Sequence, residues 1–137
     1  MPYGLEYWAN DDFIVKNGKV VLDHKSQPSL LEIVEQIRAK ELTGPLLLRF
    51  PHLIEKQIDT IYNSFEASMK TFDYQGQFHA LFPLKVNQFP EFLQALLQKG
   101  KKYNYGLEAG SKAELILAMS YNHNNTPITV NGFKDEE

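Results

Sequence analysis

Residues 78–86 form a short apolar segment that ends at a lysine, and this segment constrains the fold more than any other part of the sequence. In a β-strand, successive side chains point to opposite faces, and here both faces are apolar until the last residues. A strand of this kind is typically buried in a parallel sheet. The pattern therefore predicts a buried parallel strand with Lys85 at its carboxyl end.

A helix is predicted directly after this strand. Asn87 ends the strand, Phe89 and Pro90 begin the helix, and apolar residues recur at helical spacing as far as Gly100. In units of strand, loop and helix, ligands bind at the carboxyl ends of the strands, which is where Lys85 lies. From the residues alone, a simpler interpretation is favoured, in which the Lys85 amine extends into water.

Strands and helices alternate along the rest of the chain. Ser29 and Glu32 form a capping box that begins a helix ending before Gly44. Strands are expected at residues 45–50, 78–86, 103–108 and 126–130, with helices beginning near Pro51, Phe89 and Ser111. The helix from Pro51 carries an apolar stripe at Ile54, Ile58, Ile61, Phe65, Met69 and Phe72. Four alternations predict an α/β fold with a parallel sheet, either doubly wound or half of a barrel.

The amino-terminal residues and the composition set further limits. Residues 13–22 read as a β-hairpin with its turn at Asn17-Gly18. The chain has 137 residues, fewer than the roughly 250 of a complete eight-fold barrel. A net charge of −3 provides no basic surface for nucleic acid or an acidic membrane, and the lack of cysteine excludes disulfides and thiolate zinc sites. With no leader pattern or long apolar run, the chain is expected in the cytoplasm.

The residues around Lys85 resemble a known cofactor-attachment signature. The pattern Phe82-Pro83-x-Lys85-Val86-Asn87, followed by Phe92-Leu93, Leu96 and Gly100, is similar to the pyridoxal-phosphate attachment site of the ornithine/diaminopimelate/arginine decarboxylases. Residues 7–8, 49–51, 106–115 and 131–135 resemble the biosynthetic arginine decarboxylases within that group. The resemblance covers nearly the whole chain. Members of this family are far longer, so the chain is expected to be an amino-terminal fragment.

The resemblance also selects among the possible folds. No Gly-x-Gly-x-x-Gly pattern follows any predicted strand, and the signature belongs to barrels. Residues 27–137 are therefore expected to form the amino-terminal half of a pyridoxal-phosphate-binding (β/α) barrel, with about four β/α units. Residues 1–26 are expected to be strands of a separate β domain.

The activity implied by the resemblance is pyridoxal-phosphate-dependent decarboxylation of L-arginine to agmatine and carbon dioxide, a step of putrescine and spermidine biosynthesis. Lys85 would hold pyridoxal 5′-phosphate as a Schiff base. The family also implies Mg²⁺, with no ligand assigned, and a homo-oligomer, dimer or tetramer, when full length. The fragment alone is not expected to turn over arginine. The alternatives are an ornithine or diaminopimelate decarboxylase and a non-catalytic pyridoxal-phosphate-binding or regulatory homologue.

Glu108 is the second candidate catalytic residue. It ends the third predicted strand, at the same edge as Lys85, and it matches the first acid of the acid-x-x-Ser-x-x-Glu stretch of the family. A carboxylate there could orient the Lys85 amine or move its proton. A solvated glutamate, or an ion pair with Lys112, is an equal alternative. For Glu114, the second acid of the stretch, the capping-box spacing from Ser111 favours a structural role.

The remaining polar residues have simpler explanations. Asn87 is expected to cap a turn, and His79 is expected to be a satisfied core histidine. The spacing of His24, His52 and His123 does not suit a metal site. Asn131 and Lys134 match a family motif at the end of the fourth strand, where Lys134 could as easily be solvated.

Overall fold

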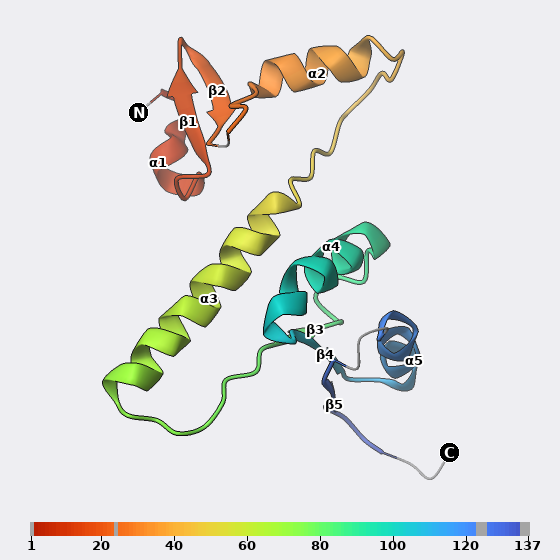
Figure 1. Cartoon of the computed structure of the whole chain (residues 1–137). Coiled ribbons are helices and arrows are strands. Elements are labelled where there is room, and N and C mark those ends of the chain that lie inside the picture. The colour runs from red at the N-terminus through yellow and green to blue at the C-terminus, as the bar shows by residue number, and fades with distance from the viewer. Residues whose placement is uncertain (1, 24, 123–125, 135–137) are drawn as a thin grey trace. The chain divides into compact units, whose positions relative to one another are not determined.

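The computed structural model describes residues 2–23, 25–122 and 126–134 (Figure 1). The described part leaves out residues 1, 24, 123–125 and 135–137, among them His24, His123 and Asp135. The chain divides into two compact units, residues 1–48 and 49–137. Each unit is described by itself.

The first unit is a small hairpin with short helices. Its elements are the 3-10 turn η1 (Pro2–Gly4), α1 (Leu5–Trp8), β1 (Phe13–Lys16), β2 (Lys19–Leu22) and α2 (Leu30–Arg38). β1 and β2 are antiparallel, and the two turn residues have positive φ, 51° at Asn17 and 71° at Gly18. Both values suit the tight turn that hairpins favour. The predicted hairpin is confirmed.

Helix α2 begins with the predicted capping box. The Ser29 hydroxyl accepts a hydrogen bond from the Glu32 amide (3.1 Å), and the Glu32 carboxylate accepts one from the Ser29 amide (3.0 Å). A β-bridge between Val21 and Ser29 joins the start of the helix to the hairpin, so both lie in the first unit. The domain boundary predicted between residues 26 and 27 concerns the longer protein, in which residues 1–26 would join a separate β domain. Contacts within the present chain do not test it, so it stays a prediction.

The second unit alternates helices with parallel strands. Its elements are α3 (His52–Thr71), β3 (Leu81–Pro83), α4 (Pro90–Gly100), the 3-10 turn η2 (Lys101–Tyr103), β4 (Gly106–Ala109), α5 (Lys112–Tyr121) and β5 (Ile128–Val130). The strands form one parallel sheet in the order β3-β4-β5. The register pairs Pro83 with Glu108, and Glu108 with Thr129. An α/β fold with a parallel sheet is confirmed.

The predicted strands are longer and more numerous than those observed. Residues 45–50 are irregular, and Leu47 is 73% exposed. A strand needs a hydrogen-bonded neighbour, and no described segment pairs with these residues. The predicted strand 78–86 is reduced to Leu81–Pro83, because β4 pairs with only these residues. Lys85 therefore lies two residues beyond the strand rather than on it.

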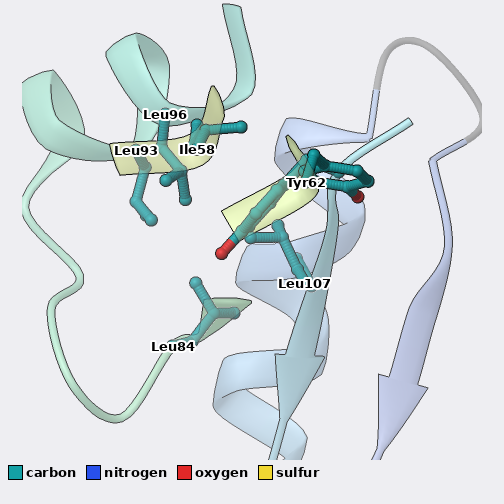
Figure 2. Close-up of a cluster of buried hydrophobic side chains, with 8 residues drawn as sticks. Ile58, Tyr62, Leu84, Leu93, Leu96 and Leu107 are labelled. Atoms are coloured by element: carbon teal, nitrogen blue, oxygen red, sulfur yellow. The ribbon is translucent and has the colours of Figure 1, made fainter. Parts of the chain in front are cut away.

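The core of the second unit lies between the sheet and helices α3 and α4. In Figure 2, Leu93 and Leu96 of α4 lie beside Ile58 of α3, with Tyr62, Leu107 and Leu84 close by. The apolar stripe predicted for α3 is partly wrong, because Ile61 and Phe65 are 38% and 48% exposed while Tyr62 is only 9% exposed. The core face of α3 therefore includes a tyrosine that apolar counting did not select.

Tyr62 can be buried because its hydroxyl is hydrogen-bonded. The oxygen accepts a bond from the Ala80 amide (3.1 Å) just before β3, and the hydroxyl donates to the Tyr103 carbonyl (3.3 Å) ahead of β4. The Tyr62 ring also stacks on the Tyr103 ring, with centroids 4.0 Å apart. One side chain of α3 thus joins the starts of two neighbouring strands.

We expect Tyr62→Phe to lower the free energy of unfolding by about 1–2 kcal/mol, because the Ala80 amide loses its partner while the ring is retained. Tyr74→Phe is the matched control, since Tyr74 is 61% exposed, and it should change stability by less than about 0.5 kcal/mol. Thermal unfolding of the full-length protein that contains this chain measures both. Equal stability of the two variants would show that the Tyr62 hydroxyl contributes nothing.

No helix in the described part of the chain is both long and apolar enough to cross a membrane.

Candidate functional site

The candidate site lies where the three parallel strands end. Parallel strands have their carboxyl ends at one edge, and hydrogen bonds continue beyond the strands there. The Leu84 amide donates to the Glu108 carbonyl (2.9 Å), and the Asn131 amide donates to the Ala109 carbonyl (2.8 Å). The residues that follow β3, β4 and β5 are therefore held together at this edge, which carries Lys85, Glu108 and Asn131.

Lys85 lies in a turn directly after β3. The turn is closed by a hydrogen bond from the Val86 amide to the Pro83 carbonyl (3.0 Å). The neighbouring Leu84 side chain is fully buried in the core, whereas Lys85 is exposed. Among the residues that the structure describes, none forms a hydrogen bond or ion pair with the Lys85 amine. The turn thus anchors its backbone through Leu84 and leaves the amine accessible.

The loop after Lys85 is held by two contacts. The Asn87 side-chain oxygen accepts a hydrogen bond from the Phe89 amide (2.9 Å), which confirms that Asn87 caps a turn. The Arg49 guanidinium carbon lies 4.2 Å from the centroid of the Phe89 ring, a cation–π contact. The second contact was not predicted. The motif at residues 49–51 and Phe89 were both noted in the sequence, but nothing in their spacing pairs them.

Glu108 lies in the middle of the three strand ends. It is half-buried, and its Oε1 atom accepts a hydrogen bond from Asn131 Nδ2 (3.2 Å). The register pairs Glu108 with Pro83 on one side and Thr129 on the other, so these residues share one face of the sheet. The opposite face carries Leu107 and packs on the helices. Lys85 therefore follows β3, and Glu108 is the next-to-last residue of the neighbouring strand β4, but no hydrogen bond joins the two side chains in the described part.

Glu114 has the structural role that its spacing indicates, with one difference. The Ser111 hydroxyl accepts a hydrogen bond from the Glu114 amide (3.2 Å), as in a capping box. The Glu114 carboxylate, however, accepts its bond from the Gly110 amide (2.7 Å). Glu114 thus fixes the loop between β4 and α5.

In the described part of the chain, the histidines and Lys134 add no metal site. His79 is exposed, with its Nε2 atom 3.3 Å from the Gln77 side-chain oxygen, so the prediction of a core histidine is wrong for this chain. Lys134 donates to the Gly132 carbonyl (3.0 Å) and is exposed, in line with the solvated alternative. Within the described residues there is no group of three or more His, Asp or Glu side chains that could hold a metal ion.

Sequence and structure comparisons identify relatives of this chain. No protein-family model matches it. A biosynthetic arginine decarboxylase from Prochlorococcus marinus (strain MIT 9313) is 35% identical over 140 residues, and one from Pelobacter propionicus is 37% identical over 141 residues. Each alignment covers 98% of this chain and 22% of the relative.

A solved structure gives the same result. The crystal structure of the biosynthetic arginine decarboxylase from Campylobacter jejuni matches with a TM-score of 0.93 and 57% sequence identity, over 98% of this chain and 23% of that one. The chain therefore spans between a fifth and a quarter of the length of the relatives that it matches. By sequence and by fold, nearly the whole of this chain is similar to one segment of the biosynthetic arginine decarboxylases.

Proposed function

We propose that the full-length protein is a cytoplasmic, pyridoxal-phosphate-dependent lyase that converts L-arginine to agmatine and carbon dioxide in polyamine biosynthesis. This chain would contribute the cofactor lysine. The family relationship supports the reaction class. The observation that carries the proposal is Lys85, a primary amine left accessible by the turn that follows a parallel strand, at the sheet edge where ligands bind.

The proposed fold of the full-length protein is a (β/α) barrel, of which residues 27–137 form part, with residues 1–26 in a separate β domain. The sheet supports this, because β3 and β5 each pair with β4 alone in the described part, so each has an open edge where a further strand could be added. Exposed apolar side chains, among them Leu47 (73%) and Ile116 (69%), also support a larger assembly. We further propose that the full-length protein is a homo-oligomer, which sedimentation velocity would test.

The residues present fit one part of a pyridoxal-phosphate site. Lys85 Nζ would hold the cofactor, since a primary amine bonds a carbonyl carbon and this amine is exposed. When bound, the group supplies an electron sink for the carbanion that remains after carbon dioxide leaves. The described residues do not fit a Mg²⁺ site, and we assign none of them to magnesium.

Glu108 would hold or move a proton at Lys85 Nζ. A lysine acts as a nucleophile only when it is unprotonated, so a nearby carboxylate that accepts or returns its proton would assist each cycle. Glu108 is the next-to-last residue of β4, at the same edge as Lys85, and the hydrogen bond from the Leu84 amide to the Glu108 carbonyl joins the two strand ends.

In the full-length protein, we expect Glu108→Gln to lower arginine turnover at least tenfold, since a positioned acid–base group contributes about a hundredfold or more. The amide has the shape of the carboxylate but cannot accept a proton at neutral pH. Gln98→Glu on the exposed side of α4 is a control for an added or removed charge. Unchanged turnover in Glu108→Gln would assign Glu108 to the solvated alternative.

The whole proposal is tested by assaying the full-length protein with L-arginine, ornithine and diaminopimelate, with carbon dioxide and amine product measured. Release of carbon dioxide and agmatine from arginine is expected. Faster release of carbon dioxide from ornithine or diaminopimelate would show that one of these amino acids, rather than arginine, is the substrate. Binding of pyridoxal phosphate without carbon dioxide release from any of the three would contradict the enzyme and favour a non-catalytic binding protein.

A further inference from the structure

Asn131 makes a side-chain contact at the candidate site that the proposed reaction has not yet used. Its Nδ2 atom donates a hydrogen bond to Glu108 Oε1 (3.2 Å) across 23 residues of sequence. We propose that Asn131 is a positioning residue, which holds the Glu108 carboxylate in the orientation that serves Lys85. This inference rests on the proposed function.

The backbone fixes where Asn131 lies. Its own amide donates to the Ala109 carbonyl (2.8 Å), so the residue is bound directly to the end of β4. On the other side of β4, the Leu84 amide donates to the Glu108 carbonyl (2.9 Å). The ends of all three strands are therefore joined by main-chain hydrogen bonds, and the Asn131 side chain acts from a fixed base.

The strand register places Glu108 between the segment that carries Lys85 and the segment that carries Asn131. Pro83, Glu108 and Thr129 are paired, and Asn131 and Lys85 each lie two residues after a member of this paired set. Side chains two residues apart in an extended chain share a face, so Asn131 lies on the same face as Glu108. Glu108 has the Asn131 segment on one side and the Lys85 segment on the other.

The hydrogen bond restrains one carboxylate oxygen. A glutamate side chain has several rotatable bonds, and an exposed one samples many rotamers. With Oε1 held from the β5 side, the carboxylate has one oxygen engaged, and the described residues supply no other side-chain partner for it. Among the residues that the structure describes, the other ionisable groups that follow strands at this edge are Lys85, Lys112, Glu114 and Lys134. Small errors in the orientation of a catalytic group cost large factors in rate.

The test uses four variants of the full-length protein: Asn131→Ala, Glu108→Gln, the double variant, and the control Asn63→Ala. Asn63 is an exposed asparagine on α3. We expect Asn131→Ala to lower kcat about tenfold with KM for arginine changed less than twofold, and to slow the absorbance change on adding pyridoxal phosphate to the cofactor-free protein. In the Glu108→Gln background, Asn131→Ala should have no further effect on either quantity.

A swapped pair separates positioning from simple support of the fold. Glu108→Gln combined with Asn131→Asp exchanges donor and acceptor, so thermal stability should return to that of the unmutated protein while kcat stays low. If Glu108 and Asn131 together only supported the fold, the swap would restore both quantities, because Glu108 would then have no proton to hold or move. Additive effects of Asn131→Ala and Glu108→Gln, or an Asn131→Ala variant equal to Asn63→Ala, would overturn the inference. Lack of decarboxylation by the unmutated protein would instead overturn the proposed function and, with it, this role.

Discussion

Replacing Lys85 with alanine in the full-length protein is expected to abolish arginine decarboxylation, with a loss of at least about a thousandfold in kcat/KM. The amine that would hold pyridoxal phosphate is removed, and the other lysines of this edge, Lys112 and Lys134, follow different strands. The fold should be unaffected, because Lys85 is exposed and makes no side-chain bond in the described part, while the adjacent Leu84 keeps its place in the core.

The measurement combines turnover with chemical mapping. Borohydride reduction of the cofactor-loaded protein, followed by peptide mapping, should place the pyridoxyl group on Lys85. Lys101→Ala is the matched control, since Lys101 is also an exposed lysine in a turn, and its turnover should be unchanged. Label on Lys99, Lys101 or Lys102, or appreciable turnover by Lys85→Ala, would reject the assignment of Lys85.

The features that could be predicted from the sequence depend on neighbouring residues. The hairpin turn needs positive φ at two successive positions, which Asn17-Gly18 supplies. The capping box of Ser29 and Glu32 is a contact within four residues. The helix Pro90–Gly100 begins at a proline and has a regular apolar face. Each of these signals lies within the element that it defines.

The predictions that failed depend on residues far apart in the chain. The segment 45–50 has the composition of a buried strand, but strand formation requires a partner edge, which the segment itself does not encode. Tyr62 is buried because the Ala80 amide and the Tyr103 carbonyl meet its hydroxyl, and counting apolar residues gives a tyrosine no such partners. Propensity and periodicity describe one element at a time.

At the candidate site, too, the positions of residues within single elements could be predicted, whereas a contact between elements could not. The sequence places Lys85 and Glu108 at strand ends, and therefore at one edge of a parallel sheet. It does not pair Glu108 with Asn131, because the length of the connecting helix and loops does not set the register between strands. One signal was available: both residues end predicted parallel strands, and polar side chains at adjacent strand ends can meet.

We expect Gly106→Ala to disturb that register and to lower the free energy of unfolding by about 3 kcal/mol in the full-length protein. A Cβ atom at residue 106 would lie 2.6 Å from Leu81 Cδ2 and closer still to the Pro127 carbonyl oxygen. That oxygen accepts the hydrogen bond of the Leu107 amide (3.0 Å), which begins the pairing of β4 with β5. The added methyl group cannot be accommodated by a rotamer change alone, because the Pro127 oxygen belongs to the backbone.

The expected consequence extends to the site. If β5 moves away from β4 to relieve the contact, Asn131 moves with it, and its hydrogen bond to Glu108 lengthens or breaks. Gly106→Ala should therefore also reproduce the loss of kcat expected for Asn131→Ala, in addition to the loss of stability. Thermal unfolding gives the first quantity, and hydrogen exchange at the Leu107 amide reports the separation of the two strands directly.

Gly110→Ala is the matched control, because it adds the same methyl group in the same segment. Its Cβ would lie 3.4 Å from the Asn131 carbonyl oxygen and from a Glu114 carboxylate oxygen, which are near-ordinary contact distances. We expect it to change stability by less than about 1 kcal/mol and to leave exchange at Leu107 unchanged. If Gly106→Ala matched this control in both measurements, β4 and β5 would have room to separate at no cost, and the close approach at Gly106 would not be what sets the register of the site.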